Sequence, residues 1–168
     1  PTVVYKCITS DKEEVIVSNP NDLPDPQRRD SILEPFCKVE IITPKEFVGQ
    51  VMDLCQTRRG DYVSLQYLNE QRAAIVYFIP LAEVVTDFFD ALKSRSKGYA
   101  SMEYVLADYR ESDLVKLEVK INNETADPLA AIVHRDNAYT IGKELAVKLK
   151  ELIPRQQFRV PIQVFMPF

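Results

Sequence analysis

The feature that most constrains the fold of this chain is an internal repeat. The tyrosine and serine positions of YVSLQY (62–67) recur in YASMEY (99–104), each 37 residues later. Upstream of each segment the features follow one order: a strand-like run, a proline, an amphipathic helical stretch, basic residues and a glycine. Two strand-helix-strand units in tandem are typical of a split βαβ, or ferredoxin-like, domain. The repeat therefore predicts a four-stranded antiparallel sheet with two helices on one face over residues 34–110.

The spacing of apolar residues places both helices of this domain. Each is expected to begin just after a proline, Pro44 or Pro80, and to end at a glycine, Gly60 or Gly98. Between these limits apolar residues recur every three or four positions, which predicts one continuous buried stripe on each helix. The first stripe is Phe47, Val48, Val51, Leu54 and Cys55, and the second is Leu81, Val84, Val85, Phe88, Phe89 and Leu92.

The flanking segments complete an α+β fold class. Residues 1–33 are expected to form a short hairpin at 1–18 followed by a proline-rich linker at 19–31. Residues 111–168 are expected to form part of a second, smaller α+β domain. There we expect a strand at 114–121, a turn at Asn122-Asn123, a helix at 138–153 and a final strand at 158–164.

Composition narrows the classes of function. The formal net charge is −4, so binding to nucleic acid would need a local basic patch. Three cysteines without a CxxC pair argue against a disulfide framework or a zinc site, and no metal is expected. No apolar run approaches the roughly 20 residues of a membrane span, and no signal peptide is recognisable. We expect a monomer in a reducing compartment.

No residue set indicates catalysis or cofactor binding in this chain. It contains no GxxxxGK[ST] motif and only four glycines, so a phosphate-cradling loop is not expected. His134-Arg135-Asp136 resembles part of a kinase catalytic loop, but the asparagine spacing, the glycine-rich loop and the DFG motif are absent. His134 is the only histidine. A structural or RNA-facing polar role for it is favoured over catalysis.

Two basic clusters suggest an anionic partner, and they have two interpretations. One cluster precedes Gly60 and the other precedes Gly98, each in the last turn of a predicted helix. Cations there offset the helix dipole and contribute about 0.3–1 kcal/mol each. The alternative is that the repeat brings both loops to the same edge of the domain, where they present cations to RNA phosphates. The candidate RNA-contacting residues are Arg58, Arg59, Lys93, Arg95, Lys97, His134, Arg135 and Arg155.

The repeat and its flanks resemble the C-terminal half of the LepA family, the translational GTPases also called elongation factor 4. The N-terminal PTVVYKC and NPNDLPDP resemble the end of that family's third domain and the connection after it. The form KSRSKGYASMEY is similar to cyanobacterial and plastid members. The other segments that carry the resemblance, in family order, are EPFCKVEIITPKEFVGQVMDLCQTRRG (34–60), PLAEVVTDFFDALKSRSKGYASMEY (80–104), LVKLEVKIN (114–122), IVHRDNAY (132–139) and LKELIPRQQF (149–158).

This resemblance implies a role on the ribosome. Family members carry an N-terminal domain that binds GTP and Mg²⁺, and that domain is not part of this sequence. Residues 34–110 would match the domain shared with elongation factor G, which faces large-subunit RNA and protein near the GTPase centre. Residues 111–168 would begin the family's own C-terminal domain, which approaches the peptidyl-site transfer RNA. The family promotes back-translocation or ribosome rescue, in a bacterial cytoplasm or the chloroplast stroma.

The two ends of the chain differ from a complete family member. The sequence opens on Pro1 without a methionine, so we expect a piece of a longer protein. After Ile162-Gln163 the family continues with small residues and a long basic tail, whereas this chain reads VFMPF. The leading hypothesis is thus a non-catalytic, ribosome-binding fragment of a GTPase. The alternatives are a free-standing ferredoxin-like module that binds a small ligand or a protein, and a small enzyme on the same fold.

Overall fold

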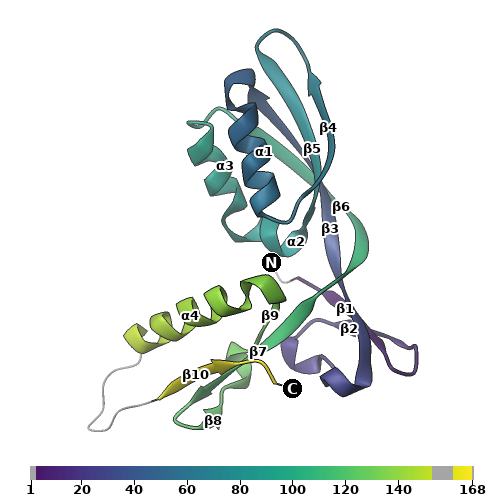
Figure 1. The fold of residues 1–168 in the computed structure, drawn as a ribbon, viewed down its shortest axis with the longest axis vertical. Coiled ribbons are helices and arrows are strands. Elements are labelled where there is room, and N and C mark those ends of the chain that lie inside the picture. Colours follow the sequence, from purple (N-terminus) through teal and green to yellow (C-terminus); the bar gives the residue numbers. More distant parts are fainter. Residues whose placement is uncertain (1–2, 153–160, 168) are drawn as a thin grey trace. The chain divides into compact units, whose positions relative to one another are not determined.

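The computed structural model describes residues 3–152 and 161–167, and it separates into two compact units. Unit 1 is formed mainly by Glu34–Arg110, and unit 2 combines Val4–Leu33 with the chain after Arg110. Each unit contains antiparallel strand pairs and helices (Figure 1). The predicted α+β fold class is therefore confirmed. Residues 4–33, expected to be a domain end and a linker, belong to the same unit as the C-terminal section.

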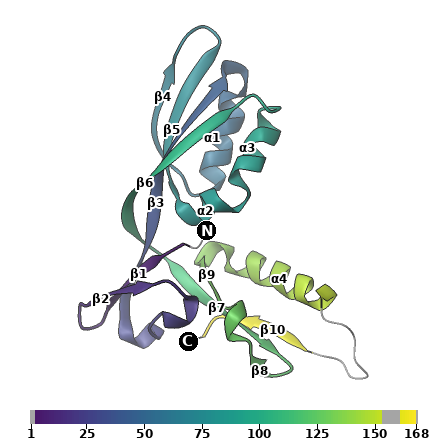
Figure 2. The same ribbon diagram turned by 180° about the vertical axis from the view of Figure 1, so that it is seen from behind.

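The sheet of unit 1 has the strand order β6-β3-β5-β4. Its strands are β3 (Arg29–Pro44), β4 (Asp61–Tyr67), β5 (Arg72–Pro80) and β6 (Ser101–Ser112). The two central strands, β3 and β5, run antiparallel from the pair Phe36↔Pro80 to the pair Pro44↔Arg72. Figure 2 shows this sheet from behind, with β4 and β6 as its edge strands. The order is that of the split βαβ fold that the repeat predicts.

Two helical segments cover one face of this sheet (Figure 1). The first is η3 (Lys45–Phe47) with α1 (Val48–Thr57), and its predicted apolar stripe is buried as expected. Alternate residues of the central strands face it, because side chains of a strand alternate between the two faces of a sheet. These inward residues are Cys37, Val39, Ile41, Ala73, Ile75, Tyr77 and Ile79, each with 0% of its surface exposed.

The second helical segment is interrupted, unlike the continuous helix that the sequence predicts. It consists of α2 (Leu81–Glu83), a wide π-type turn η4 (Val84–Phe88) and α3 (Phe89–Arg95). Thr86 departs from helical geometry with ψ −112, and its Oγ1 donates a hydrogen bond to the Ala82 carbonyl at 2.6 Å. The predicted stripe is buried only in part. Val84, Phe88 and Leu92 are buried, whereas Phe89 is 48% exposed.

Both helices of the repeat end in the same backbone motif. Arg59 and Lys97 adopt left-handed backbone with φ of 59 and 53, and a glycine follows each. The N–H of Gly60 donates to the Cys55 carbonyl at 2.9 Å, and that of Gly98 to the Lys93 carbonyl at 2.8 Å. These bonds satisfy carbonyls at the end of each helix. The residue before each glycine is thus a left-handed cation, and at the second helix end Gly98 is left-handed as well, with φ 87.

Unit 2 begins with a hairpin and two short turns. Strands β1 (Tyr5–Thr9) and β2 (Glu14–Val17) form the predicted hairpin, and β1 also pairs with the first residues of β3. The proline-rich stretch forms two 3₁₀ turns, η1 (Pro20–Asp22) and η2 (Pro26–Arg28). The Asn21 side chain donates to the Asp127 carbonyl at 2.8 Å, across 106 residues of sequence. Such a contact fixes the stretch within the unit.

The rest of unit 2 is a sheet around one central strand, with a helix packed on it. The strands are β7 (Leu114–Ile121), which pairs with each of the others, β8 (Glu124–Thr125), β9 (Ala131–His134) and β10 (Ile162–Phe165). A turn, η5 (Asp127–Leu129), precedes β9, and the helix α4 (Arg135–Leu152) follows it. The predicted final strand is observed over its later residues, while residues 158–160 lie outside the described chain.

Helix α4 lies close to β10 because its facing residues are small. Ala138 and Gly142 are its buried positions, and they pack with Leu117 of β7 and Val164 of β10. A Cβ atom added at Gly142 would lie 3.4 Å from the Val164 side chain. The helix begins three residues earlier than the sequence predicts, since its first turn is capped by the residue before it, as described below.

The three cysteines are buried in the two units. Cys7, Cys37 and Cys55 are free thiols with 0% exposure. Burial raises the pKa of the Cys55 thiol to about 12, so it stays protonated near neutral pH. Within the described residues, no helix is both long and apolar enough to cross a lipid bilayer.

Candidate nucleic-acid interface

The two basic loops of unit 1 lie at opposite ends of its sheet. The expectation that they share one edge is wrong, because the antiparallel β3–β5 pair relates the two halves of the repeat by a rotation. Each loop therefore reaches the start of the other half's helix. Arg58 bonds Asp87 in η4, whereas Arg95 bonds Asp53 and the Gln50 carbonyl in α1. We call these the Arg59 end and the Lys97 end.

The Arg59 end is organised around a buried carboxylate. Glu34 is 1% exposed, and Arg59 donates to its two oxygens at 2.6 and 3.1 Å. A further bond from Arg59 reaches Glu83 at 3.4 Å. Burial alone would lower the pKa of Arg59, but hydrogen bonds and the charges of Glu34 and Glu83 outweigh it and raise that pKa. The Arg59 guanidinium therefore links the end of α1 to β3 and α2.

Arg58 at the same end is paired on the surface. Its Nη1 lies 2.7 Å from Asp87 Oδ1, and the Asp87 side chain is 63% exposed. The hydrogen bond from Arg58 lowers the pKa of Asp87. The pair therefore stabilises the fold above the ordinary carboxyl range, and this contribution is lost as pH falls through the lowered pKa. With Glu34, Glu83 and Asp87 against two arginines, the Arg59 end is a poor site for phosphate.

Lys93 and Arg95 serve largely to hold the end of α3. The Lys93 ammonium donates to the Ala100 carbonyl at 2.6 Å and lies 5.4 Å from the centre of the Phe89 ring. Arg95 Nη1 donates to Asp53 at 2.8 Å, which ties the last turn of α3 to α1. For these two residues the structural interpretation of the basic cluster is the better supported one.

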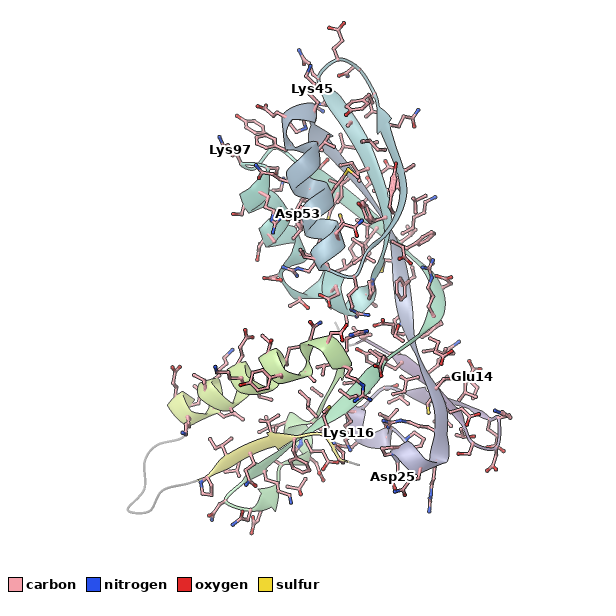
Figure 3. All side chains as sticks on the ribbon, viewed as in Figure 1. Glu14, Asp25, Lys45, Asp53, Lys97 and Lys116 are labelled. Atoms are coloured by element: carbon pink, nitrogen blue, oxygen red, sulfur yellow. The ribbon has the colours of Figure 1, made fainter. Side chains whose placement is uncertain are left out.

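Lys97 differs from its neighbours and defines a cationic surface. It is exposed in the turn after α3, and Figure 3 shows Lys97 and Lys45 directed outward at the same end of unit 1. Arg72 belongs to this end because it pairs with Pro44, and the backbone N–H of Lys45 donates to Gln71 at 2.9 Å. Within the part of the chain that the structure describes, Lys45, Arg72 and Lys97 form no ion pair.

Exposed aromatic residues lie close to these cations along the chain. Tyr99 is 73% exposed two residues after Lys97, and Tyr67 is 60% exposed at the end of β4 that leads to the hairpin loop before Arg72. Carboxylates are present at this end as well, since Glu46 follows Lys45 and Glu70 lies two residues before Arg72. Exposed cations with aromatic rings beside them suit contacts to phosphates and bases.

Sequence reasoning identified only part of the Lys97 end. It singled out Lys97 from the basic run, but it missed Lys45 and Arg72, which stand alone in the sequence. The signal that could have found them is the rotation implied by the repeat, which places the start of one helix beside the end of the other. The end of β3 and the start of β5 then follow from their antiparallel pairing.

The remaining predicted residues belong to unit 2. His134 Nδ1 accepts a hydrogen bond from the N–H of Asp136 at 3.2 Å, so it caps α4. The same nitrogen lies 3.6 Å from a carboxylate oxygen of Asp136. Arg135 Nε donates to both oxygens of Asp113 at 3.0 Å. Arg155 lies outside the described residues.

The described residues show no site fitted to GTP or Mg²⁺. A nucleotide of this kind needs a glycine-rich loop before a helix, and the sequence has neither that motif nor enough glycines to build one. In the described ranges, no group of three or more His, Cys, Asp or Glu side chains could hold a metal ion.

Comparison with known proteins gives two domain matches and a set of close relatives. A family model for the elongation factor G C-terminus matches residues 31–120, and a model for the C-terminus of the GTP-binding protein LepA matches residues 121–167. Elongation factor 4 of Synechococcus elongatus is 60% identical over 163 residues, or 97% of this chain. Those of Prochlorococcus marinus strain MIT 9515 and of a Picosynechococcus species are 58% identical over the same length. The chain spans 27% of the length of these relatives.

Proposed function

Because the chain belongs to the LepA, or elongation factor 4, family through the two C-terminal domains that it contains, we propose that it is the ribosome-binding part of a translational GTPase. In this proposal the chain is non-catalytic and acts as a monomer. It contacts large-subunit RNA and protein near the GTPase centre with unit 1, and approaches the peptidyl-site transfer RNA with unit 2. The proposed location of the protein is a bacterial cytoplasm or the chloroplast stroma.

The observation that best supports the proposal is that the cations at the Lys97 end are exposed and form no ion pair with the described residues. Most other arginines and lysines singled out by the sequence are bonded to carboxylates or carbonyls of the chain itself. Lys45, Arg72 and Lys97 are exposed and, in the described chain, without ion pairs. A phosphate group can bind them without breaking an internal contact, which is why this end favours RNA.

In the complete protein this chain would couple ribosome binding to GTP hydrolysis elsewhere. GTP and Mg²⁺ would be held by a nucleotide-binding domain that this sequence does not contain. The proposed outcome of the cycle is back-translocation or rescue of a ribosome. The part supplied here is recognition, because the residues that the structure describes present charge and aromatic surface but no assembled nucleophile, base and orienting group.

A variant that removes all three cations tests the proposal. Lys45→Gln, Arg72→Gln and Lys97→Gly are combined, glycine being chosen because Lys97 has left-handed backbone. We expect binding to ribosomal large subunits, measured by co-sedimentation over a salt series, to weaken by about tenfold or more. The slope of log affinity against log salt should fall by about 2–3, since three phosphate contacts are lost.

Control variants separate this effect from a general loss of charge or of stability. Arg58→Gln removes a cation at the Arg59 end, and Lys38→Gln removes an exposed cation from β3. Both should leave the salt slope unchanged, and the triple variant should melt within a few degrees of the parent chain. An unchanged slope in the triple variant would overturn the proposal. Saturable binding of a metabolite without co-sedimentation would favour the free-standing ligand-binding module instead.

A further inference from the structure

Unit 2 contains a groove between α4 and β10 that the proposed function does not use. Its volume is about 490 Å³, which is within the range of sites that hold small organic groups. The floor is apolar, with Leu117 of β7 and Val164 and Phe165 of β10. On the helix side Ala138, Gly142 and Ala146 leave room for a flat group because their side chains are small.

The rim of this groove carries an aromatic ring between two cations. Arg135, Tyr139 and Lys143 lie four residues apart on α4, so they form one row along the helix. Tyr139 is 79% exposed, so most of the apolar surface of its ring is in contact with water. Among the described residues that line the groove, the charged ones are both cations.

The two cations keep donors available beside the ring. Arg135 is bonded to Asp113 through Nε, and in the described chain no bond engages its two terminal nitrogens. Lys143 is exposed, without an ion pair in that same part of the chain. A third cation lies close by, since the Lys120 ammonium is 5.1 Å from the centre of the Phe165 ring. Apart from the Asp113 carboxylate that Arg135 binds, these charges are positive, and they complement an anion rather than a neutral peptide.

We propose that this groove binds an unpaired nucleotide of RNA, with the base stacked on Tyr139 over the apolar floor and the flanking phosphates held by Arg135 and Lys143. This rests on the proposed function for its RNA partner and adds the chemical form of that RNA. A paired base offers no free ring face, so the groove selects single-stranded or splayed nucleotides. Stacking on an exposed aromatic ring is how such nucleotides are commonly bound.

The absence of tryptophan from the sequence gives a direct probe. Tyr139→Trp would be the sole tryptophan of the chain, and it keeps a stacking ring. Its fluorescence is followed as a short single-stranded RNA or a blunt duplex of equal length is added. We expect saturable quenching by the single strand and little by the duplex. Equal quenching by both, or none by either, would overturn the proposal.

Affinity measurements on matched variants complete the test. Tyr139→Ala should weaken binding of a labelled single-stranded RNA by about fivefold or more, and Tyr139→Phe should retain it. Thr140→Ala is the control, because it changes the next exposed residue on α4 but not the groove. A thermal melt confirms that each variant is folded. If Tyr139→Ala binds like the parent chain, the groove is not an RNA site.

These measurements are independent of the ribosome. If the groove binds single-stranded RNA but the chain does not co-sediment with ribosomal subunits, the nucleotide site stands and the proposed function fails. If co-sedimentation through the Lys97 end is observed without any effect at Tyr139, the proposed function stands and the nucleotide site is rejected.

Discussion

Replacing Arg59 by alanine is expected to lower the free energy of unfolding by about 3–5 kcal/mol, because it leaves the buried Glu34 carboxylate without its main partner. The carboxylate is 1% exposed and accepts two bonds from Arg59. A buried carboxylate that has lost its partner is compensated neither by water nor by a cation, and this lowers the stability of the folded state. Chemical denaturation of the isolated chain, followed by circular dichroism, measures the change.

The neighbouring arginine supplies the control for this prediction. Arg58→Ala removes a cation of the same loop, but its partner Asp87 is largely solvated, so we expect a loss of about 0.2–1 kcal/mol. Arg59→Gly adds a second comparison, because glycine relieves the left-handed backbone at φ 59 yet still removes the guanidinium. If Arg59→Ala and Arg58→Ala destabilise the chain equally, the buried pair is not what holds the Arg59 end together.

Replacing Gly60 by alanine is expected to cost about 2–3 kcal/mol through overpacking. A Cβ atom there would lie 2.6 Å from the Cys55 carbonyl oxygen and 3.0 Å from the Tyr77 ring. The first of these is a backbone atom that also accepts the Gly60 N–H bond ending α1. Relief of the clash would therefore break that bond. The same denaturation experiment detects the loss.

A second glycine provides the matched comparison. A Cβ atom at Gly49, near the start of α1, meets nothing within 4 Å. Gly49→Ala should stabilise the chain by up to about 1 kcal/mol, since alanine loses less backbone entropy in a helix. If Gly60→Ala instead leaves the free energy of unfolding unchanged, the close approach of α1 to β5 at this point is not a feature of the protein.

Much of unit 1 could be predicted because its pattern is local and repeated. The stripe of α1 and the alternation of β3 and β5 are set by residues within one element, where helix and strand periods decide which side faces the core. The left-handed turns could be located to within one residue by the glycines that follow them. The interruption at Thr86 could not, because the apolar spacing of the second helix is equally compatible with a regular helix.

The functional surface was less predictable because it depends on pairing between distant residues. Glu34 and Arg59 are 25 positions apart, and no local pattern indicates that one neutralises the other. Lys45 and Arg72 come together only through the antiparallel pairing of β3 and β5. The three cations of residues 93–97 look alike in the sequence. In the structure Lys93 and Arg95 hold the end of α3, whereas Lys97 is exposed to solvent. A count of cations cannot show which of them have internal partners.

The central claim is that the Lys97 end, and not the Arg59 end, faces ribosomal RNA, and site-directed cleavage from a tethered iron chelate tests it most directly. The native thiols are buried with 0% exposure, so a chelate attaches selectively to Lys97→Cys or Arg58→Cys. With each labelled chain bound to large ribosomal subunits, we predict cleavage of ribosomal RNA from position 97 and little from position 58. Cleavage from position 58 with none from position 97 would contradict the account.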